Sequence, residues 1–157
     1  MTATAPVLIL GGTAEARALA ETLTGDAIPV ISSLAGRVRN PRLPVGEVRV
    51  GGFGGADGLA DWLRDHGIRA VVDATHPLAA QITANAHAAC ARTGVPLVRL
   101  ARPAWRPGVD DRWTCVPDIG AAATAVAERG GRVFLTTGRQ DAHAFAEITD
   151  AWFLIRV

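Results

Sequence analysis

The residues best placed to do chemistry follow the first apolar run of the chain. Residues 7–10 read VLIL, and Gly11, Gly12 and Thr13 come directly after them. A helical pattern over 13–24 begins at once, so the glycines form a turn between a strand and a helix. The amides at such a helix N-terminus attract phosphate groups. The stretch therefore predicts a site for a phosphate-bearing ligand.

This turn is a degenerate form of the dinucleotide-binding turn. Gly11, Thr13 and Ala16 stand at the glycine positions of G-x-G-x-x-G. Thr13 is a natural helix N-cap, and we include Ala14 and Glu15 among the candidate cofactor-binding residues. Glu15 either starts the helix facing away from the ligand or bonds the backbone or a ribose hydroxyl. An ordinary glycine turn without a dinucleotide is the alternative interpretation.

The end of the second predicted strand indicates which dinucleotide would bind. NAD-binding domains place Asp or Glu here, to accept hydrogen bonds from the ribose 2′-hydroxyl. This chain has Ser32, Ser33 and Arg37 and no acid. Serines and an arginine suit a 2′-phosphate, so the sequence predicts NADPH as cofactor. The alternative is that Arg37 is a solvated loop residue.

The third predicted strand ends in a loop that reads GGFGG, residues 51–55. Glycines allow the backbone to approach a flat ligand closely. We expect Gly52 and Phe53 to contact the cofactor, with the aromatic ring against an adenine or nicotinamide. In the alternative interpretation Phe53 covers the core.

The fourth predicted strand ends in DATHP, residues 73–77. Ligands bind at the carboxyl ends of parallel strands, so Thr75 is a candidate cofactor contact. His76 is the tentative catalytic residue, which would orient a substrate carboxylate or relay a proton. A purely structural histidine is the alternative.

A second candidate anion site lies in TTGRQ, residues 136–140. The segment repeats the order of strand, glycine and helix seen in the first turn. Arg139 would hold a carboxylate there. The alternative is an ordinary turn between a strand and a helix.

Strand and helix patterns alternate along the chain. The predicted strands are 6–11, 28–32, 47–51, 69–74 and 96–101, and the predicted helices are 13–24, 56–66 and 78–93. This order favours an α/β fold with a Rossmann-like parallel sheet. We assign residues 1–101 to a cofactor-binding domain and 102–112 to a linker.

Residues 113–157 look like part of a second Rossmann-like unit. Its predicted elements are an apolar patch at 113–116, helices at 119–129 and 139–148, and strands at 132–137 and 151–157. The chain stops inside an apolar strand. We expect either a truncated form of a longer protein or a strand, 151–157, that pairs with the first sheet or with another chain.

Composition excludes several classes of function. The chain has 157 residues and a net charge of +1, which gives no support for nucleic-acid or membrane binding. Cys90 and Cys115 lack a CxxC spacing and are read as free thiols. The histidines have no metal-ligand spacing, so we expect no metal site. Without a signal peptide or a membrane span, we expect a cytoplasmic protein.

The combined segments LILGGTAEARALA, SSLAGR, GGFGG, DATHPLA and FLTTGRQ resemble the precorrin-6A reductase family of cobalamin biosynthesis. The resemblance runs from residue 7 to the end of the chain, and members of the family are longer. It implies NADPH-dependent reduction of one double bond in a tetrapyrrole macrocycle, giving precorrin-6B. It implies that Gly11–Thr13 and Ser32–Arg37 hold the cofactor. The implied substrate-binding residues are Arg17, His76, Arg139 and Gln140.

Three alternatives to this function stay open. The cobalt-containing form of precorrin-6A would suit the same site, with the metal carried by the substrate. A regulatory or redox-sensing NADP-binding domain would share the first turn and Arg37 without a reaction of its own. A flavodoxin-like module would bind a mononucleotide, which flavin absorbance would reveal.

Overall fold

The computed structural model describes residues 4–36, 42–103, 105–139 and 141–156. Arg37 and Gln140, two of the predicted site residues, lie outside these residues. The chain divides into two compact units, Met1–Ala104 and Trp105–Val157. The predicted cofactor turn belongs to the first unit.

The first unit is built on a five-stranded parallel sheet. Its strands are β1 (Val7–Leu10), β2 (Val30–Leu34), β3 (Glu47–Val50), β4 (Ala70–Asp73) and β5 (Leu97–Arg99). Their order is β3-β2-β1-β4-β5, so the chain moves outward from β1 in one direction and then in the other. These strands follow the first five places of the Rossmann strand order 3-2-1-4-5-6, which confirms the predicted α/β fold with a Rossmann-like parallel sheet.

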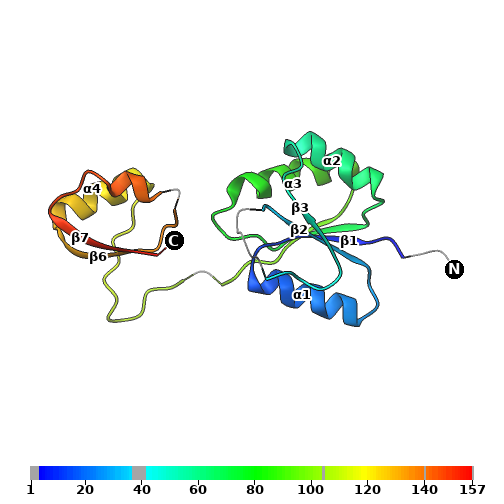
Figure 1. Cartoon of the computed structure of the whole chain (residues 1–157), viewed down its shortest axis with the longest axis horizontal. Helices are drawn as coiled ribbons and strands as arrows, with labels where there is room; N and C mark the ends of the chain where they lie inside the picture. The colour runs from blue at the N-terminus through cyan, green and yellow to red at the C-terminus, as the bar shows by residue number, and fades with distance from the viewer. Residues whose placement is uncertain (1–3, 37–41, 104, 140, 157) are drawn as a thin grey trace. The chain divides into compact units, whose positions relative to one another are not determined.

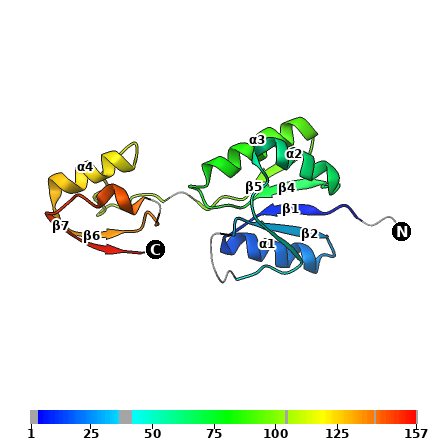
Figure 2. The same cartoon turned by 45° about the horizontal axis from the view of Figure 1, so that its top comes forward.

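Helices cover both faces of this sheet (Figures 1 and 2). On one face α1 (Ala14–Gly25) packs through Ala16 and Ala20 against Val7, Ile9 and Val30. On the other face α2 (Gly55–Asp65) and α3 (Ala80–Thr93) bury a larger cluster. That cluster comprises Leu8, Leu10, Ile31, Leu59, Ala60, Leu63, Ile68, Val71, Ala86, Ala89 and Cys90.

Burial on both faces explains why the central strands are continuous apolar runs. All four residues of β1 are buried, and burying one such side chain contributes about 1.5–3 kcal/mol. Cys90 also lies in this core, where burial raises the pKa of its thiol.

The prediction for the second strand was wrong at its end. We expected a strand over 28–32, but β2 continues to Leu34. Ser32 and Ser33 are therefore buried inside the strand, paired with Ile9 and Leu10 of β1. The backbone ladders to β1 and β3 extend the strand through two serines whose polar character had suggested a loop.

The second unit is smaller and only partly follows the prediction. Helix α4 (Ile119–Arg129) begins at Asp118, whose carboxylate accepts a hydrogen bond from the Ala121 amide. Strands β6 (Gly131–Leu135) and β7 (Ala151–Ile155) form a parallel pair. Residues 113–116 are exposed and belong to neither a helix nor a strand.

The helix predicted over 139–148 is also wrong. The described part of this segment holds only a short 3-10 helix, η1 (Ala142–Phe145). Phe145 is its single buried anchor, and Asp141 makes no side-chain cap. Short helices need a cap or a buried face to offset the cost of nucleation.

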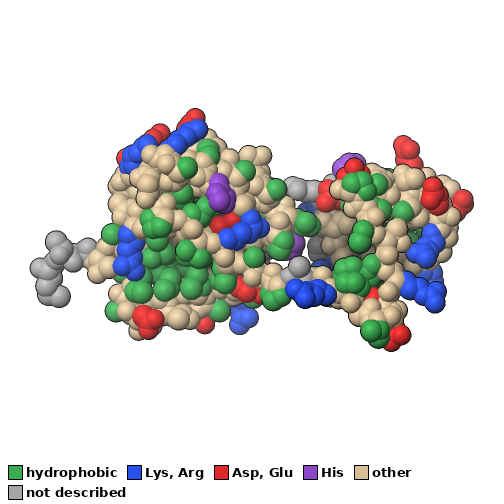
Figure 3. All heavy atoms as spheres, turned by 180° about the vertical axis from the view of Figure 1, so that it is seen from behind, with side chains coloured by type: hydrophobic (Ala, Val, Ile, Leu, Met, Phe, Trp, Pro, Cys, Tyr) green, Lys and Arg blue, Asp and Glu red, His purple; other side chains and the backbone are tan. Residues whose placement is uncertain are grey.

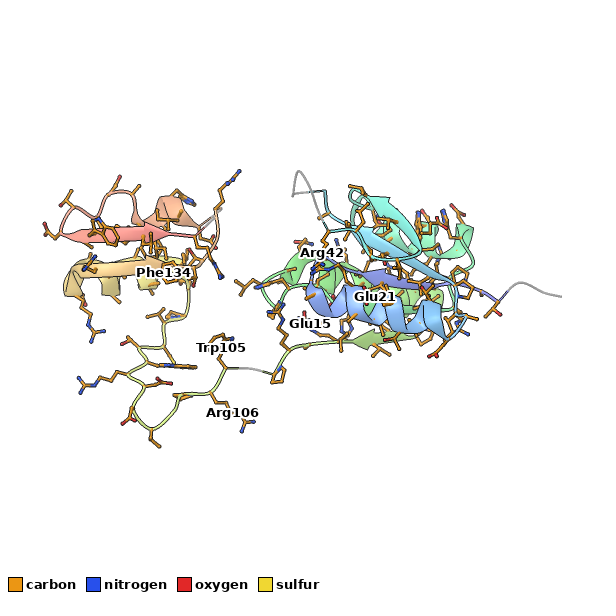
Figure 4. The ribbon with its side chains drawn as sticks, turned by 60° about the horizontal axis from the view of Figure 1, so that its bottom comes forward. Glu15, Glu21, Arg42, Trp105, Arg106 and Phe134 are labelled. Carbon is orange, nitrogen blue, oxygen red and sulfur yellow. The ribbon has the colours of Figure 1, made fainter. Side chains whose placement is uncertain are left out.

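Each unit carries apolar side chains at its surface. In the second unit, Phe134 on β6 is 59% exposed (Figure 4). Trp152 and Leu154 on β7 are 54% and 52% exposed. In the first unit, Val98 on the edge strand β5 is 58% exposed. Figure 3 shows hydrophobic side chains gathered on one face of the first unit.

The described residues hold neither a membrane-spanning helix nor a metal-binding cluster. No described helix combines the length and the apolar character that a membrane crossing requires. No group of three or more His, Cys, Asp or Glu side chains is arranged to hold a metal ion in the part of the chain that the structure describes.

Candidate functional site

The candidate site is the edge of the first sheet where its parallel strands end. Backbone hydrogen bonds continue one residue past the strands: Gly11 N–H donates to Ser33 O at 2.9 Å, and Ala74 N–H donates to Leu10 O at 2.9 Å. The strand order reverses at this point, because β2 and β3 lie on one side of β1 and β4 and β5 on the other. Open α/β sheets bind ligands in the crevice at such a reversal.

Thr13 links the turn after β1 to the turn after β4. Its hydroxyl donates to Ala74 O after β4 at 2.8 Å and accepts from the Ala16 amide in the first turn of α1 at 3.1 Å. The single side chain thus caps α1 and fixes the turn after β1 against the turn after β4. The single proton of this hydroxyl is therefore already donated within the protein.

We expect Thr13→Ala to lower the free energy of unfolding by about 2 kcal/mol, because it removes an N-cap and a second hydrogen bond. Thr13→Ser keeps the hydroxyl and should stay within about 0.5 kcal/mol of the parent. Urea denaturation measures both. An equal loss in the two variants would show that the methyl group, and not the hydroxyl, is responsible.

The glycine turn has room for a ligand. Gly12 adopts φ +110°, which favours glycine, and a Cβ placed there would meet no atom within 4 Å. Ala14 is exposed at the first position of α1. First-turn amides of a helix have no partner within the helix. The residues present therefore fit a dinucleotide diphosphate beside Gly12, Thr13 and Ala14.

Glu15 lies at the same helix end, and Glu21 lies further along α1 (Figure 4). The Glu15 carboxylate is bound by Arg102, with Nε to Oε1 at 2.8 Å and Nη2 to Oε2 at 3.0 Å. This hydrogen bond, together with one from the Glu15 amide and the charge of Arg102, lowers the pKa of Glu15. Glu15 is thus paired with Arg102, which follows β5 in the sequence.

Asp73, at the end of β4, organises the DATHP segment. Its carboxylate is buried and accepts from the Thr75 amide (3.1 Å), the Thr75 hydroxyl (2.6 Å) and the Thr83 hydroxyl (2.7 Å). Arg99 Nη1 lies 3.8 Å away. Burial by itself raises the pKa of Asp73. The hydrogen bonds from Thr75 and Thr83 and the charge of Arg99 together outweigh burial, so the pKa lies below its ordinary value. Asp73 is an ionised anchor for Thr75 and α3.

His76 stands exposed on the loop that Asp73 anchors. The Leu78 amide donates to His76 Nδ1 at 3.2 Å. A neutral imidazole whose Nδ1 accepts a hydrogen bond carries its proton on Nε2. The ring therefore offers an N–H donor to an outside group.

The GGFGG loop is organised by Arg49 of β3. The guanidinium donates from Nη1 to Ser33 Oγ (2.8 Å) and Gly51 O (3.0 Å), and from Nη2 to Gly52 O (3.0 Å). It also lies 3.8 Å from the centre of the Phe53 ring. The loop exposes Gly52 while its backbone carbonyls face the arginine.

The Phe53 side chain packs against the core of the first unit. Its ring meets Trp62 edge-on at 5.5 Å and packs against the buried cluster beneath α2. With Arg49 over one face, this geometry favours the interpretation in which Phe53 covers the core. Gly52 remains the exposed residue of the pair at this edge.

The two predicted serines differ in their surroundings. Ser33 Oγ is engaged by Arg49. Ser32 Oγ is buried and has no partner among the described residues. Ser32 pairs with Ile9 in the middle of the ladder, so the structure brings Ser33, but not Ser32, toward the strand ends.

The remaining predicted residues lie in two places. Arg17 is half-buried on α1, one turn past Thr13. Arg139 is exposed in the second unit. The turn at 136–139 leads to the four-residue η1, so the predicted N-terminus of a longer helix is not present there. Thr137 Oγ1 is buried in this turn without a partner among the described residues.

Sequence reasoning missed three residues that shape the site. Arg49 had a usable signal, because a charged residue inside the strand EVRV directly precedes the glycine loop. Asp73 belonged to DATHP, yet its anchoring role depends on Thr83, ten residues later. Arg102 fell in the predicted linker, and no local pattern connects it with Glu15.

Comparison with known proteins decides the family. The model of the precorrin-6x reductase CbiJ/CobK family matches residues 6–157. The chain belongs to this family. Precorrin-6A reductases from Rhodococcus erythropolis and Mycobacterium tuberculosis (strain H37Rv) are similar to it, at 57% identity over 151 residues and 59% over 152. Each match covers 96% of this chain, but only 61% and 60% of the relative.

A solved structure of this CbiJ/CobK family agrees with the fold. It is described as CobK precorrin-6A reductase and is 44% identical, with a TM-score of 0.92 over 98% of this chain and 61% of the other. A cobalt-precorrin-6A reductase from Salmonella typhimurium (strain LT2) is 35% identical over 144 residues, covering 86% of this chain and 52% of the relative. The chain thus spans about 60% of the length of the first relatives it matches.

Proposed function

We propose that this chain supplies the NADPH-binding part of a precorrin-6A reductase, an oxidoreductase of cobalamin biosynthesis that reduces one double bond of the macrocycle to give precorrin-6B. The family match over residues 6–157 carries this proposal. The chain covers only 61% and 60% of the length of the relatives from Rhodococcus erythropolis and Mycobacterium tuberculosis, so the proposal assigns it one part of such a reductase.

The proposed cofactor site is the edge at Gly11, Gly12, Thr13 and Ala14. NADPH, when bound, supplies the hydride for the reduction. The protein's task is to hold two flat partners in the right geometry and to keep water away from them. Gly52 and Thr75 border the same edge of the sheet, on the loops after β3 and β4.

Four residues are proposed for the substrate side. His76 offers its Nε2–H to a substrate carboxylate, which suits a macrocycle with many acidic side chains. Arg17, Arg139 and Gln140 are further candidates from their positions in family-like segments. The proton donor of the reaction is left unassigned, and solvent is one candidate.

The metal-free substrate is favoured over its cobalt form by the pattern of identity. Relatives named precorrin-6A reductase are 45–59% identical to this chain. Those named cobalt-precorrin-6A reductase are 31–35% identical.

We expect the chain to bind NADPH about ten- to a hundredfold more tightly than NADH, because a charge-assisted hydrogen bond to the 2′-phosphate contributes roughly 1.5–3 kcal/mol. Arg37→Ala should weaken NADPH binding far more than NADH binding. Calorimetric titration with both nucleotides measures this. If Arg37→Ala loses equal affinity for NADPH and NADH, Arg37 does not bind the 2′-phosphate. If the parent binds both nucleotides with equal affinity, the predicted preference for NADPH is wrong.

Turnover is tested in a chimera that joins residues 1–157 to the remaining residues of the Rhodococcus erythropolis relative. We expect the chimera to reduce precorrin-6A with NADPH. The change in absorbance of the macrocycle measures this reaction. Tight NADPH binding without turnover, in a chimera that folds, would favour the regulatory domain instead.

A further inference from the structure

The first turn of α1 presents an electrostatic conflict. Glu15 places a carboxylate at the helix end where the proposed diphosphate would lie. A carboxylate there stabilises a helix dipole, but it repels a phosphate at the same place. A dinucleotide site at this turn therefore needs a means of offsetting the charge of Glu15.

Arg102 supplies a matching positive charge from a distant part of the sequence. It is 87 residues from Glu15 and lies three residues after the end of β5. Two nitrogens of its guanidinium, Nε and Nη2, bind the two carboxylate oxygens separately. Such two-point pairing fixes the orientation of both side chains. Among the described residues, no acceptor engages Nη1 of Arg102.

We propose that Arg102 is a positioning residue for the cofactor turn: by holding and neutralising Glu15, it lets the N-terminus of α1 accept an anionic dinucleotide. This rests on the proposed function, because it concerns the same NADPH site. The pair is partly solvent-exposed, with side-chain exposures of 53% for Arg102 and 39% for Glu15. Its main effect is therefore on the local charge and less on the stability of the fold.

We expect the parent and three variants to differ in their affinity for NADPH. Arg102→Ala leaves Glu15 uncompensated and should weaken NADPH binding about tenfold. Glu15→Gln leaves Arg102 uncompensated and should strengthen it severalfold. The double variant E15Q/R102A has the parent's net charge at the turn and should return to within about threefold of the parent.

Calorimetric titration of the full chain with NADPH tests this order. If Arg102 instead bonds the phosphate directly, the double variant stays as weak as Arg102→Ala, and the proposal is overturned. It is also overturned if Arg102→Ala binds like the parent. If the parent itself fails to bind NADPH, the proposed function fails too, which is a different result from a parent that binds and variants that do not differ.

Two further readouts separate charge from structure. Raising the ionic strength from 0.1 to 1 M shortens the Debye length from about 10 to about 3 Å, so the deficit of Arg102→Ala should shrink. Arg92→Ala breaks another exposed ion pair of the same unit, with Asp57 on α2, and should leave the affinity unchanged. The thermal midpoint of ligand-free Arg102→Ala should fall by no more than a few degrees. A salt-independent deficit, or one that Arg92→Ala shares, would contradict the charge mechanism.

Discussion

Replacement of Asp73 by alanine is expected to lower the free energy of unfolding by about 3 kcal/mol, because hydrogen bonds to a charged group contribute roughly 1.5–3 kcal/mol. The carboxylate is 2% exposed and accepts three hydrogen bonds from Thr75 and Thr83. Its removal leaves the Thr83 hydroxyl and the Arg99 guanidinium without their anion. Since whole domains are stable by about 5–15 kcal/mol, the loss is a large fraction of the total. Urea denaturation followed by circular dichroism measures it.

The matched control is Asp61→Ala on α2. Asp61 also pairs with an arginine, Arg64, but both side chains are more than half exposed. Exposed pairs contribute about 0–1 kcal/mol, so this variant should unfold close to the parent. Equal losses at Asp61 and Asp73 would contradict the anchoring role of Asp73.

The pH dependence follows from the lowered pKa of Asp73. Its folded-state pKa lies below the ordinary value of 3.8. The contribution is therefore fully present above pH 3.8 and is lost as the pH falls through the lower, folded-state value. Asp73→Asn cannot ionise, so the stability gap between it and the parent should narrow only in acid, below about pH 4. A gap that narrows near neutral pH would contradict this assignment.

Gly58→Ala is expected to destabilise the first unit by about 3 kcal/mol. A Cβ at Gly58 on α2 would overlap the carbonyl oxygen of Phe53 and lie 3.0 Å from its carbonyl carbon. The obstacle is backbone, so the GGFGG loop or the helix has to move. That movement would also disturb the contacts that Arg49 makes with Gly51 and Gly52.

Gly25→Ala is the matched control for this prediction. Gly25 ends α1, and a Cβ there would meet nothing within 4 Å. Because alanine favours helix over glycine by up to about 1 kcal/mol, the control should be neutral or stabilising. Thermal unfolding compares the two variants. A Gly58→Ala protein as stable as the parent would show that the loop after β3 yields without cost.

The sequence predicted most of the first unit because its signals were local. The strand at 7–10, for example, is an apolar run followed by a glycine turn and a helical pattern, and repetition of that order favours a parallel sheet. The prediction for β2 ended too early because its two serines resemble loop residues in the sequence. They belong to the strand because they pair with β1 and β3, and the local sequence does not reveal this pairing. The segment 139–148 misled because helical spacing was present without a cap or a sufficient buried face.

Half of the candidate site could be predicted for the same reason. The turn at Gly11–Thr13 and the DATHP segment lie at strand ends, where ligands of parallel sheets bind. The groups that hold these segments in place are contributed from elsewhere. Thr83 reaches Asp73 from α3, and Arg102 reaches Glu15 from beyond β5. Such long-range pairs depend on how the elements pack, so spacing alone does not reveal them.

Binding of NADPH at the edge formed by Gly11–Ala14 is tested by titrating the isotope-labelled chain with NADPH and following its backbone amide resonances. We expect saturable shifts that are largest at Gly11–Ala14, with further shifts at Gly51–Gly55 and Thr75. Saturating NADPH that leaves the amides of Gly11–Ala14 unmoved would contradict this expectation.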